Sequence, residues 1–402
     1  MHAVKLISVV NMTNHPKILL FYEELKAAGG AERLLFEEER YFRKRGINSS
    51  IVTFSLNTEA LFDYRPEEIE VIKAGKSCVS RIFELRKRLI EINPDLIITL
   101  PSISLYIATL FTSIPYITHI HGTIFWFPRD TSKYALIYRN VFSEVRNSVI
   151  GHKEFIPIYP RCNIMNRIAL EFLAIMDYLA VRKSIKIITL TDQLKWEIKK
   201  IYDRDAIVAR GCLSEMYFPH MPNEDIREKL GIQNNKVILN IGRLDPRKRI
   251  DVLIKSFAKI LPNNNSLILL IGGTGEEKDK LERLAEGLGI KEKVKFLGFI
   301  SDSQLYDYYA ACDVYAFPSW TSSGITPYEA LAVGKKVVWT SEADEPVLGD
   351  KHVFVAEPNE EDFAKALEKA LNTEAEGKVN LSEYTWDAYF KTVYDAAIRA
   401  IS

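Results

Sequence analysis

The sequence lacks a surplus of charge of either sign, and its few cysteines form no motif. Its 402 residues include 53 basic and 53 acidic side chains, so the formal net charge is zero. Proteins dedicated to nucleic acid normally carry a basic surplus, and we therefore expect no nucleic-acid partner. The four cysteines include no Cys-x-x-Cys pair, which excludes a zinc ribbon and a thioredoxin-type motif. Scattered cysteines of this kind are typical of reduced thiols in the cytoplasm.

The sequence also lacks a recognisable leader segment and a convincing membrane span. The first ten residues, MHAVKLISVV, have no basic region ahead of a long apolar stretch, and they predict a β-strand at residues 4–10 instead of a signal peptide. Residues 96–118 carry no charge, but Pro101 and Pro115 interrupt them. This segment therefore predicts a strand, a short helix and a second strand, not a transmembrane helix.

Short apolar runs alternate with amphipathic stretches along both halves of the chain, which predicts parallel sheets covered by helices. The predicted strands are residues 4–10, 50–54, 95–100, 116–120, 185–190, 237–241, 267–271, 294–297, 314–317 and 336–339. The predicted helices are residues 32–45, 80–91, 105–111, 251–260, 277–288, 303–311, 327–333 and 384–401. The least regular region lies between residues 122 and 185.

The length predicts two domains, because a single core rarely grows beyond ~250–300 residues. We expect an α/β protein of two Rossmann-like, doubly wound domains that face each other across a cleft. The expected boundaries are residues 1–215 and 216–383, since Pro219 and Pro222 interrupt regular structure between the halves. A last packing helix is expected within residues 384–402.

The zero net charge is the sum of two opposite halves. Residues 1–210 hold 30 basic and 23 acidic side chains (30 − 23 = +7), and residues 211–402 hold 23 and 30 (23 − 30 = −7). In the first half, basic residues gather at Arg40, Arg43, Lys44 and Arg45, and aromatic residues such as Trp126 lie among further basic ones. This pattern suggests a face for an anionic membrane surface or a lipid-linked acceptor; core packing with a solvated face is the alternative.

Two loops follow predicted strands of the second half. The segment IGRLDPRK places Arg243 and Lys248 at the carboxyl edge of a sheet. Arg can grip phosphate oxygens in a fork and Lys supplies a compact charge, although such a pair often belongs to an ordinary solvated loop. The segment LIGGTG contains Gly273, which can admit a ligand close to the backbone or merely form a tight turn. It lacks the Lys-Ser/Thr ending of a P-loop.

The segment FPSWTSSGITPYEA predicts an anion site at the start of a helix. The backbone N–H groups of Gly324, Ile325 and Thr326 are expected to point out of the helix start, where they suit a diphosphate. Within the same helix, Glu329 can accept hydrogen bonds from both hydroxyls of a ribose. Its alternative role is to stabilise the helix dipole.

The first half supplies two further candidates. Gly30 in the segment GGAE opens the first predicted helix and forms a matching anion-friendly start on the opposite wall. His119 and His121 end a predicted strand, but no third ligand lies nearby, so a hydrogen-bonding His121 is favoured over a metal site.

In their order and spacing these segments resemble the family 4 nucleotide-sugar glycosyltransferases, which have the GT-B fold. The resemblance runs from GGAERLLFEEERYFRKRG through INPDLI, THIHG, LNIGRLDPRKRIDVLI and LIGGTG to YEALAVGKKVV. It implies a retaining transfer without a metal or other cofactor, from a nucleoside-diphosphate sugar to a glycan or lipid-linked acceptor. It also implies that the C-terminal helix crosses back to the first domain, and that the enzyme is cytoplasmic or peripheral on the inner face of the cell membrane.

Carried onto this sequence, the resemblance implies that Gly30 lets the backbone approach the donor diphosphate. Arg243 and Lys248 neutralise that diphosphate as it leaves, and Glu329 binds the ribose. Electrostatic stabilisation of the departing group is then the main catalytic contribution.

The resemblance further implies that Phe299 lies where the base is held and that His121 touches the transferred sugar. Thr321 stands where the family commonly has a first Glu, eight residues before the second, and Arg249 stands where the family often has Gly. The Thr321 departure motivates one alternative, a nucleotide-sugar-binding protein without transferase activity. A GT-B nucleotide-sugar epimerase is a second, separate alternative.

Overall fold

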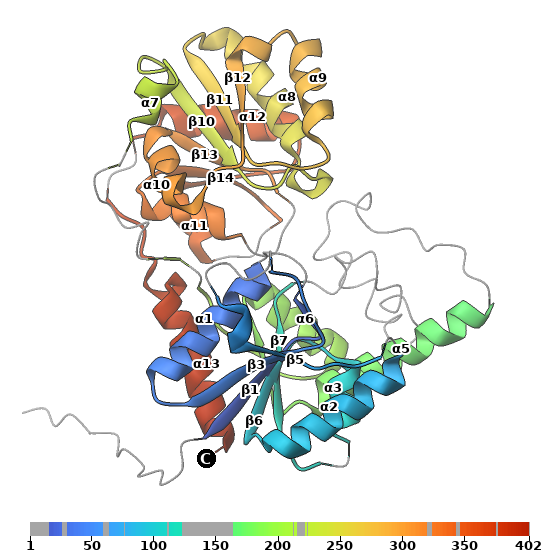
Figure 1. Cartoon of the computed structure of the whole chain (residues 1–402). Helices are drawn as coiled ribbons and strands as arrows, with labels where there is room; N and C mark the ends of the chain where they lie inside the picture. The colour runs from blue at the N-terminus through green and yellow to red at the C-terminus, as the bar shows by residue number, and fades with distance from the viewer. Residues whose placement is uncertain are drawn as a thin grey trace, which may run out of the picture.

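The computed structural model consists of two α/β domains and a helix that returns from the second to the first (Figure 1). The structure describes residues 16–25, 30–58, 64–75, 77–110, 112–122, 164–211, 213–214, 222, 224–319, 324–342, 346–374 and 377–401. The predicted strand at residues 4–10 lies outside these ranges, and so do Trp126 and Thr321.

The first domain is built on a seven-stranded parallel sheet in the order β5-β3-β1-β6-β7-β8-β9. Its central strand β1 (Lys17–Phe21) is apolar along its length, and residues 18–21 are fully buried, as expected for a strand covered on both faces. The other strands are β3 (Asn48–Thr53), β5 (Ile69–Val71), β6 (Leu96–Thr99), β7 (Tyr116–Ile120), β8 (Lys186–Thr189) and β9 (Ile207–Val208). A separate short pair joins β2 (Glu24–Leu25) to β4 (Ser55–Leu56).

The helices of this domain are α1 (Gly30–Lys44), α2 (Cys78–Ile92), α3 (Ile103–Ala108), α5 (Ile164–Lys183) and α6 (Asp192–Tyr202). The expectation that residues 122–185 are irregular is wrong in part, because α5 occupies twenty of them. Its sequence is apolar around much of its circumference, so hydrophobic periodicity did not reveal it.

The uncharged segment 96–118 forms β6, α3 and the start of β7, as predicted. Within the described ranges, no helix is long and apolar enough to cross a membrane.

The second domain has a six-stranded parallel sheet in the order β12-β11-β10-β13-β14-β15. The strands are β10 (Lys236–Ile241), β11 (Leu267–Gly272), β12 (Val294–Gly298), β13 (Val314–Phe317), β14 (Lys336–Thr340) and β15 (Val353–Ala356). The helices are α7 (Ile226–Lys229), α8 (Ile250–Ile260), α9 (Lys278–Gly287), α10 (Asp302–Ala311), α11 (Ile325–Ala332) and α12 (Glu360–Asn372). The predicted strands and helices of this half are confirmed to within a few residues; α7, β15 and α12 are additional.

The last helix, α13 (Trp386–Ile401), packs against the first domain, as the resemblance implied. The rings of Tyr41 in α1 and Phe390 in α13 lie 5.2 Å apart, and Figure 1 shows the red helix beside α1. The chain thus crosses between the domains twice, and the crossings touch: Leu213 N donates to Tyr384 O over 2.9 Å and Trp386 N to Leu213 O over 3.2 Å. The exact domain boundaries stay a prediction, because residues 215–221 lie outside the described ranges.

One ion pair shows which edges of the two domains face each other. Arg33 in the first turn of α1 lies 3.6 Å from Asp302 in the first turn of α10. Helix α1 begins after the carboxyl end of β1, and α10 begins after the carboxyl end of β12. The carboxyl edges of the two parallel sheets therefore meet here, which is where α/β folds bind their ligands.

Candidate active site

The basic loop after β10 has two cations in different environments. Arg243 is 75% exposed and lies 3.8 Å from the Asp245 carboxylate. Asp245 also accepts a hydrogen bond from Arg247 N over 3.0 Å and so caps the single turn that ends at Lys248. The cap fixes the turn, which leaves Arg243 extended into solvent and holds Lys248 against the protein.

Lys248 is half-buried, and this position disfavours the charged form of its amino group. Burial is the main reason why the pKa of Lys248 falls to about 8; Arg243 and Arg247 lower it further, and Asp245 acts in the opposite direction. The Lys248 ammonium lies 5.6 Å from the centre of the Phe317 ring, a cation–π arrangement. An ammonium held with a lowered pKa is a candidate functional group, since a bound anion would restore its charge.

The start of α11 is the predicted anion site, and within the described ranges it has no side-chain cap. Its N-cap is Gly324, and no side chain caps the helix, so the first-turn N–H groups of Ile325 and Thr326 are not occupied by a cap residue. A Cβ at Gly324 would lie 2.5 Å from the Phe317 ring. The Phe317 ring is therefore a neighbour of both the Lys248 ammonium and the helix start, which brings a cation close to a helix N-terminus.

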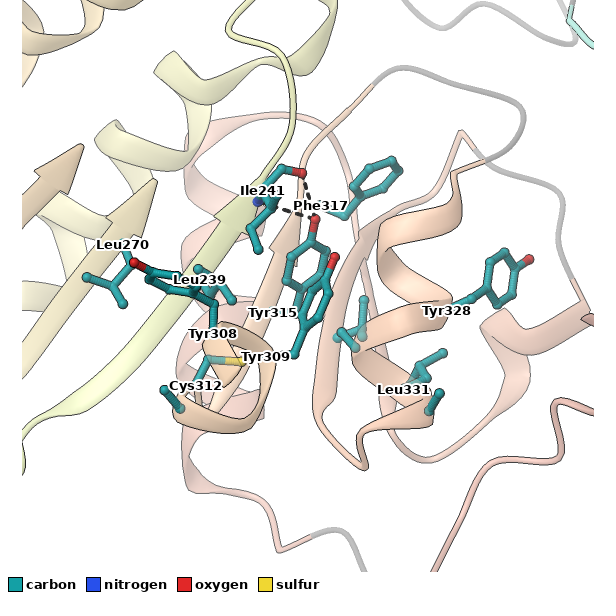
Figure 2. Packing of buried hydrophobic residues seen from close by; sticks show 14 of the residues in the cluster. Leu239, Ile241, Leu270, Tyr308, Tyr309, Cys312, Tyr315, Phe317, Tyr328 and Leu331 are labelled. Atoms are coloured by element: carbon teal, nitrogen blue, oxygen red, sulfur yellow. Dashed lines mark hydrogen bonds between the residues drawn. The ribbon is translucent and has the colours of Figure 1, made fainter. Parts of the chain in front are cut away.

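Glu329 lies inside α11 and is only 6% exposed. The Tyr309 hydroxyl donates a hydrogen bond to Glu329 Oε2 over 2.7 Å. The neighbouring Tyr315 donates to Ile241 O over 3.0 Å, and the two tyrosine rings lie 5.5 Å apart (Figure 2). Through these two side chains, α11 is tied to the end of β10, from which the basic loop starts.

Tyr309, Tyr315 and Phe317 are functional-site residues that the sequence reasoning missed. Their only signal in the sequence was the aromatic side chains of the segment YDYYAACDVYAF. This pattern is equally typical of residues buried in a hydrophobic core. The polar ends of buried tyrosines need partners, and here the partners are parts of the site.

The glycine loop after β11 has a packing role in the structure. Gly273 has φ of +124°, and a Cβ there would lie 1.8 Å from Gly242 O. Leu244 N donates to Thr274 O over 2.9 Å, so the glycine loop and the basic loop are joined backbone to backbone. In the structure, the close approach that Gly273 permits is that of the basic loop, and its predicted role in donor binding stays a prediction.

Phe299 follows β12 at the border of the same loop. Gly273 N donates to Gly298 O over 2.6 Å, and the next side chain, Phe299, is 78% exposed. An exposed ring beside the site has the chemistry to stack on a base, which keeps the predicted role open.

On the first domain, α1 begins at Gly30, as predicted, and a Cβ there would meet nothing within 4 Å. His121 comes directly after β7, and its Nε2 lies 3.4 Å from His119 Nδ1. Burial, and to a smaller extent His119, lowers the pKa of His121 to about 3, so this imidazole is neutral at ordinary pH. In the described part of the chain, no three His, Cys, Asp or Glu side chains are grouped so that they could hold a metal ion.

The basic residues predicted for an acceptor or membrane face lie at the other end of α1. Lys44 is fourteen residues from Gly30, a distance of roughly 20 Å at 1.5 Å per residue. Arg40 pairs with Glu37 at 2.8 Å, and Arg43 pairs with Glu39 at 2.8 Å. Arg45 lies over the Tyr41 ring at 3.6 Å. This cluster is therefore separate from the residues around α11, Lys248 and His121.

Two facing Rossmann-like domains, with an uncapped helix start and a lysine on the second, define a GT-B protein of the nucleotide-dependent class. Two family models match the chain: "Glycosyltransferase Family 4" over residues 28–152 and "Glycosyl transferases group 1" over residues 222–386. Together they cover most of both domains. The chain belongs to the GT-B glycosyltransferases of group 1, family 4.

Curated relatives match over part of their length. An uncharacterized glycosyltransferase of Methanocaldococcus jannaschii is 35% identical over 175 residues, 41% of this chain and 45% of the relative. A D-inositol 3-phosphate glycosyltransferase of Corynebacterium aurimucosum is 31% identical over 42% of this chain and 44% of the relative. The alpha-monoglucosyldiacylglycerol synthase of Streptococcus pneumoniae is 30% identical over 37% of this chain and 34% of the relative. The chain thus spans less than half the length of these relatives.

Solved structures match over nearly the whole chain. A glycosyltransferase of Rickettsia africae gives a TM-score of 0.65 at 17% identity, with 96% of this chain and 94% of that chain covered. HepE of Anabaena, solved in complex with UDP, gives 0.66 at 18% identity, with 96% of both chains covered. At such identities the likeness establishes the fold.

Proposed function

We propose that the protein is a retaining, metal-independent glycosyltransferase that moves a sugar from a nucleoside-diphosphate sugar to a glycan or lipid-linked acceptor. The observation that carries the proposal is the uncapped start of α11 beside the Lys248 ammonium, with the buried Glu329 in the same helix. A diphosphate fits the first two groups, and a ribose fits the third. The matched relatives, whose names describe glycosyl transfer, and the UDP complex of HepE support it.

The chemistry required of these residues is electrostatic. As the bond between the sugar and the diphosphate breaks, negative charge grows on the leaving oxygens. Lys248, Arg243 and the N–H groups at the start of α11 are placed to stabilise that charge. His121, neutral at working pH, lies on the other domain and can hydrogen-bond the sugar, while Gly30 leaves room for the diphosphate at the start of α1.

Sugar transfer is tested with purified protein and a panel of UDP-, GDP- and ADP-sugars. A thermal-shift screen identifies the donor, because a ligand that binds the folded state raises its apparent stability. Product analysis with that donor then follows release of the nucleoside diphosphate and the anomeric configuration of the product. We expect retention and activity that survives EDTA. Inversion, or loss of activity that Mg²⁺ or Mn²⁺ restores, would contradict the corresponding part of the proposal.

The two cations of the basic loop have a matched control in the same loop. We expect Arg243→Ala and Lys248→Ala each to lower kcat/KM by a factor that corresponds to roughly 2–4 kcal/mol. Arg247 is engaged with Asp245 at 3.3 Å, so Arg247→Ala should have a much smaller effect. Donor binding without turnover in the unmodified protein would favour a nucleotide-sugar-binding protein, and isomerised donor without acceptor would favour an epimerase.

For the acceptor side, we infer an anionic or lipid-linked partner that meets the first domain. A surface hollow of about 460 Å³ is lined by Arg40, Arg43 and Lys44. Large apolar side chains are exposed on α2 and α5, among them Phe83 at 66% and Phe172 at 59%. Helix α2 covers the face of the sheet opposite to α1, so these apolar side chains and the basic hollow belong to separate surfaces. A basic surface and an apolar one can each contact a bilayer, and the name of the S. pneumoniae relative agrees with a lipid acceptor.

The carboxylate partners of Arg40 and Arg43 reduce the charge that this face offers to lipid. Liposome flotation of the full chain should therefore show a modest dependence on anionic lipid that Lys44→Glu weakens further. Flotation that does not depend on anionic lipid would remove the membrane part of the proposal.

A further inference from the structure

A buried polar chain runs through the first domain and is not explained by the donor site. Its members are Glu38 of α1, His119 of β7 and Tyr389 of α13, and none of the three is more than 1% exposed. The Tyr389 hydroxyl donates a hydrogen bond to Glu38 Oε1 over 2.6 Å. The same Glu38 oxygen lies 3.3 Å from His119 Nδ1. Polar groups buried in an apolar core lower stability unless they interact, so this arrangement calls for a role.

The chain ends at the candidate active-site histidine. His119 Nδ1, the atom beside the carboxylate, also lies 3.4 Å from His121 Nε2. The two imidazole rings have their centres 5.3 Å apart. Contacts thus run without interruption from α13 through α1 and β7 to His121.

The carboxylate determines where the protons lie. Glu38 favours the His119 tautomer with its proton on Nδ1, because the other tautomer would set a lone pair against a carboxylate oxygen at 3.3 Å. The single Nδ1 proton of His119 is then shared between Glu38 Oε1 and His121 Nε2, and because a donor faces it, His121 Nε2 must be an acceptor. His121 is neutral and has one ring proton, so that proton lies on Nδ1.

The far end of the chain lies at the crossing between the domains. A Cβ on Gly211 would lie 2.4 Å from Tyr389 Cβ and 2.9 Å from Thr385 O. The start of α13 therefore packs directly against the segment that leaves the first domain. The bridge between Leu213 and Thr385 is formed at the same place. The Tyr389 side chain is therefore held by the segments that join the two domains.

We propose that Tyr389, Glu38 and His119 are positioning residues that fix the Nδ1-protonated tautomer of His121 and hold it in register with the crossing between the domains. His121 then offers Nδ1–H to an oxygen of the donor sugar or of the acceptor. Among the residues that the structure describes, His121 Nδ1 is buried without a hydrogen-bond partner, and an unmet buried donor lowers stability until a ligand oxygen accepts from it. The role of His121 in sugar transfer rests on the proposed function, whereas the assignment of its tautomer is independent of that function.

The tautomer is measured by ¹⁵N NMR of the full chain labelled at its seven histidines, with His121→Asn used to assign the signals. We expect a protonated Nδ1 and an unprotonated Nε2 for His121. Glu38→Gln should shift this pattern towards a mixture of tautomers. The matched control is Glu39→Gln, the next residue of α1, which is equally buried but contacts Arg43 and Ser49 instead of His119. A protonated Nε2 in the unmodified protein, or equal effects of the two variants, would overturn the proposal.

A kinetic test separates positioning from packing. Tyr389→Phe keeps the buried ring and removes only the hydroxyl, and it should lower kcat about tenfold, the factor that corresponds to roughly 1.4 kcal/mol, with little change in KM for the donor. His119→Asn, whose amide nitrogen can take the place of Nδ1–H, should retain more activity than His119→Ala. Equal losses in both His119 variants, or an unchanged kcat in Tyr389→Phe, would contradict positioning.

The two proposals fail in distinguishable ways. If no nucleotide sugar supports transfer while His121 shows the expected tautomer, the proposed function is wrong and the positioning chain stands. If transfer occurs while His121 carries its proton on Nε2, the positioning chain is wrong and the function stands.

Discussion

Replacement of Lys248 by Met should stabilise the protein and weaken its response to a nucleoside diphosphate. In the fold the pKa of Lys248 is about 8 in place of 10.5, mainly because of burial. At about 1.36 kcal/mol per pH unit, the charged form is disfavoured by roughly 3 kcal/mol at neutral pH, and partial solvent contact reduces this to an expected gain of about 1–3 kcal/mol for the variant. Met is close to Lys in length and keeps the contact with Phe317.

The stability gained in Lys248→Met should fall as the pH rises. Between pH 8 and 10.5 the unfolded chain binds more protons at this site than the folded one, so the stability of the unmodified protein rises with pH over that range. The advantage of Lys248→Met should therefore be full below about pH 8 and vanish by about pH 10.5.

Thermal unfolding measured from pH 7 to 10.5, with and without a nucleoside diphosphate, tests both effects. The ligand should raise the melting temperature of the unmodified protein more than that of the variant. The control is Lys255→Met on α8, where an exposed pair with Asp251 at 3.5 Å contributes at most about 1 kcal/mol. A variant that is less stable than the unmodified protein at pH 7, or whose melting temperature rises as much with the diphosphate as that of the unmodified protein, would refute the reasoning.

Other predictions concern the glycines, the tyrosine behind Glu329 and metal. Gly273→Ala should cost more than about 2 kcal/mol of stability, because a Cβ would clash with the basic loop and the positive φ would be strained. Gly30→Ala should leave the melting temperature unchanged or slightly raised but weaken donor binding, which titration calorimetry measures. Tyr309→Phe should raise KM for the donor about three- to tenfold, and the effect should disappear with a 2′-deoxyribose donor if Glu329 binds the ribose. Chelation with EDTA should leave kcat unchanged.

Much of the fold could be predicted because its strands are continuous apolar runs, which is how strands buried on both faces read in a sequence. The strand at 314–317 and the helix starting near Pro327 are examples that the structure confirms within two residues. Helix α5 was not predicted, because its apolar residues are distributed around the helix and give no clear periodicity.

The candidate site, too, could be predicted only in part from the sequence. Local motifs placed Arg243, Lys248 and Glu329 together, since parallel strands end at one edge of a sheet. The lowered pKa of Lys248 depends on burial by tertiary contacts, which no local pattern encodes. The contact between Tyr389 and Glu38 joins residues 351 positions apart, and only the return of α13 to the first domain creates it.

Arg249 shows how a departure from a family pattern becomes intelligible in the structure. The position has φ of +48°, a left-handed conformation that favours glycine, which explains why the family often has Gly there. In this protein the Arg249 side chain compensates through a buried ion pair with Glu342, the second oxygen of which lies 3.0 Å from Nη2. The pair also secures the residue that follows Lys248.

The central claim is that the start of α11 and the basic loop bind the diphosphate of a nucleotide sugar. Calorimetric titration of the unmodified protein and of Lys248→Ala with a nucleoside diphosphate and with the corresponding nucleoside tests it most directly. The account predicts that the unmodified protein prefers the diphosphate, and that Lys248→Ala loses about tenfold or more of that preference while its affinity for the nucleoside is unchanged. Equal affinity of the two proteins for the diphosphate would contradict it.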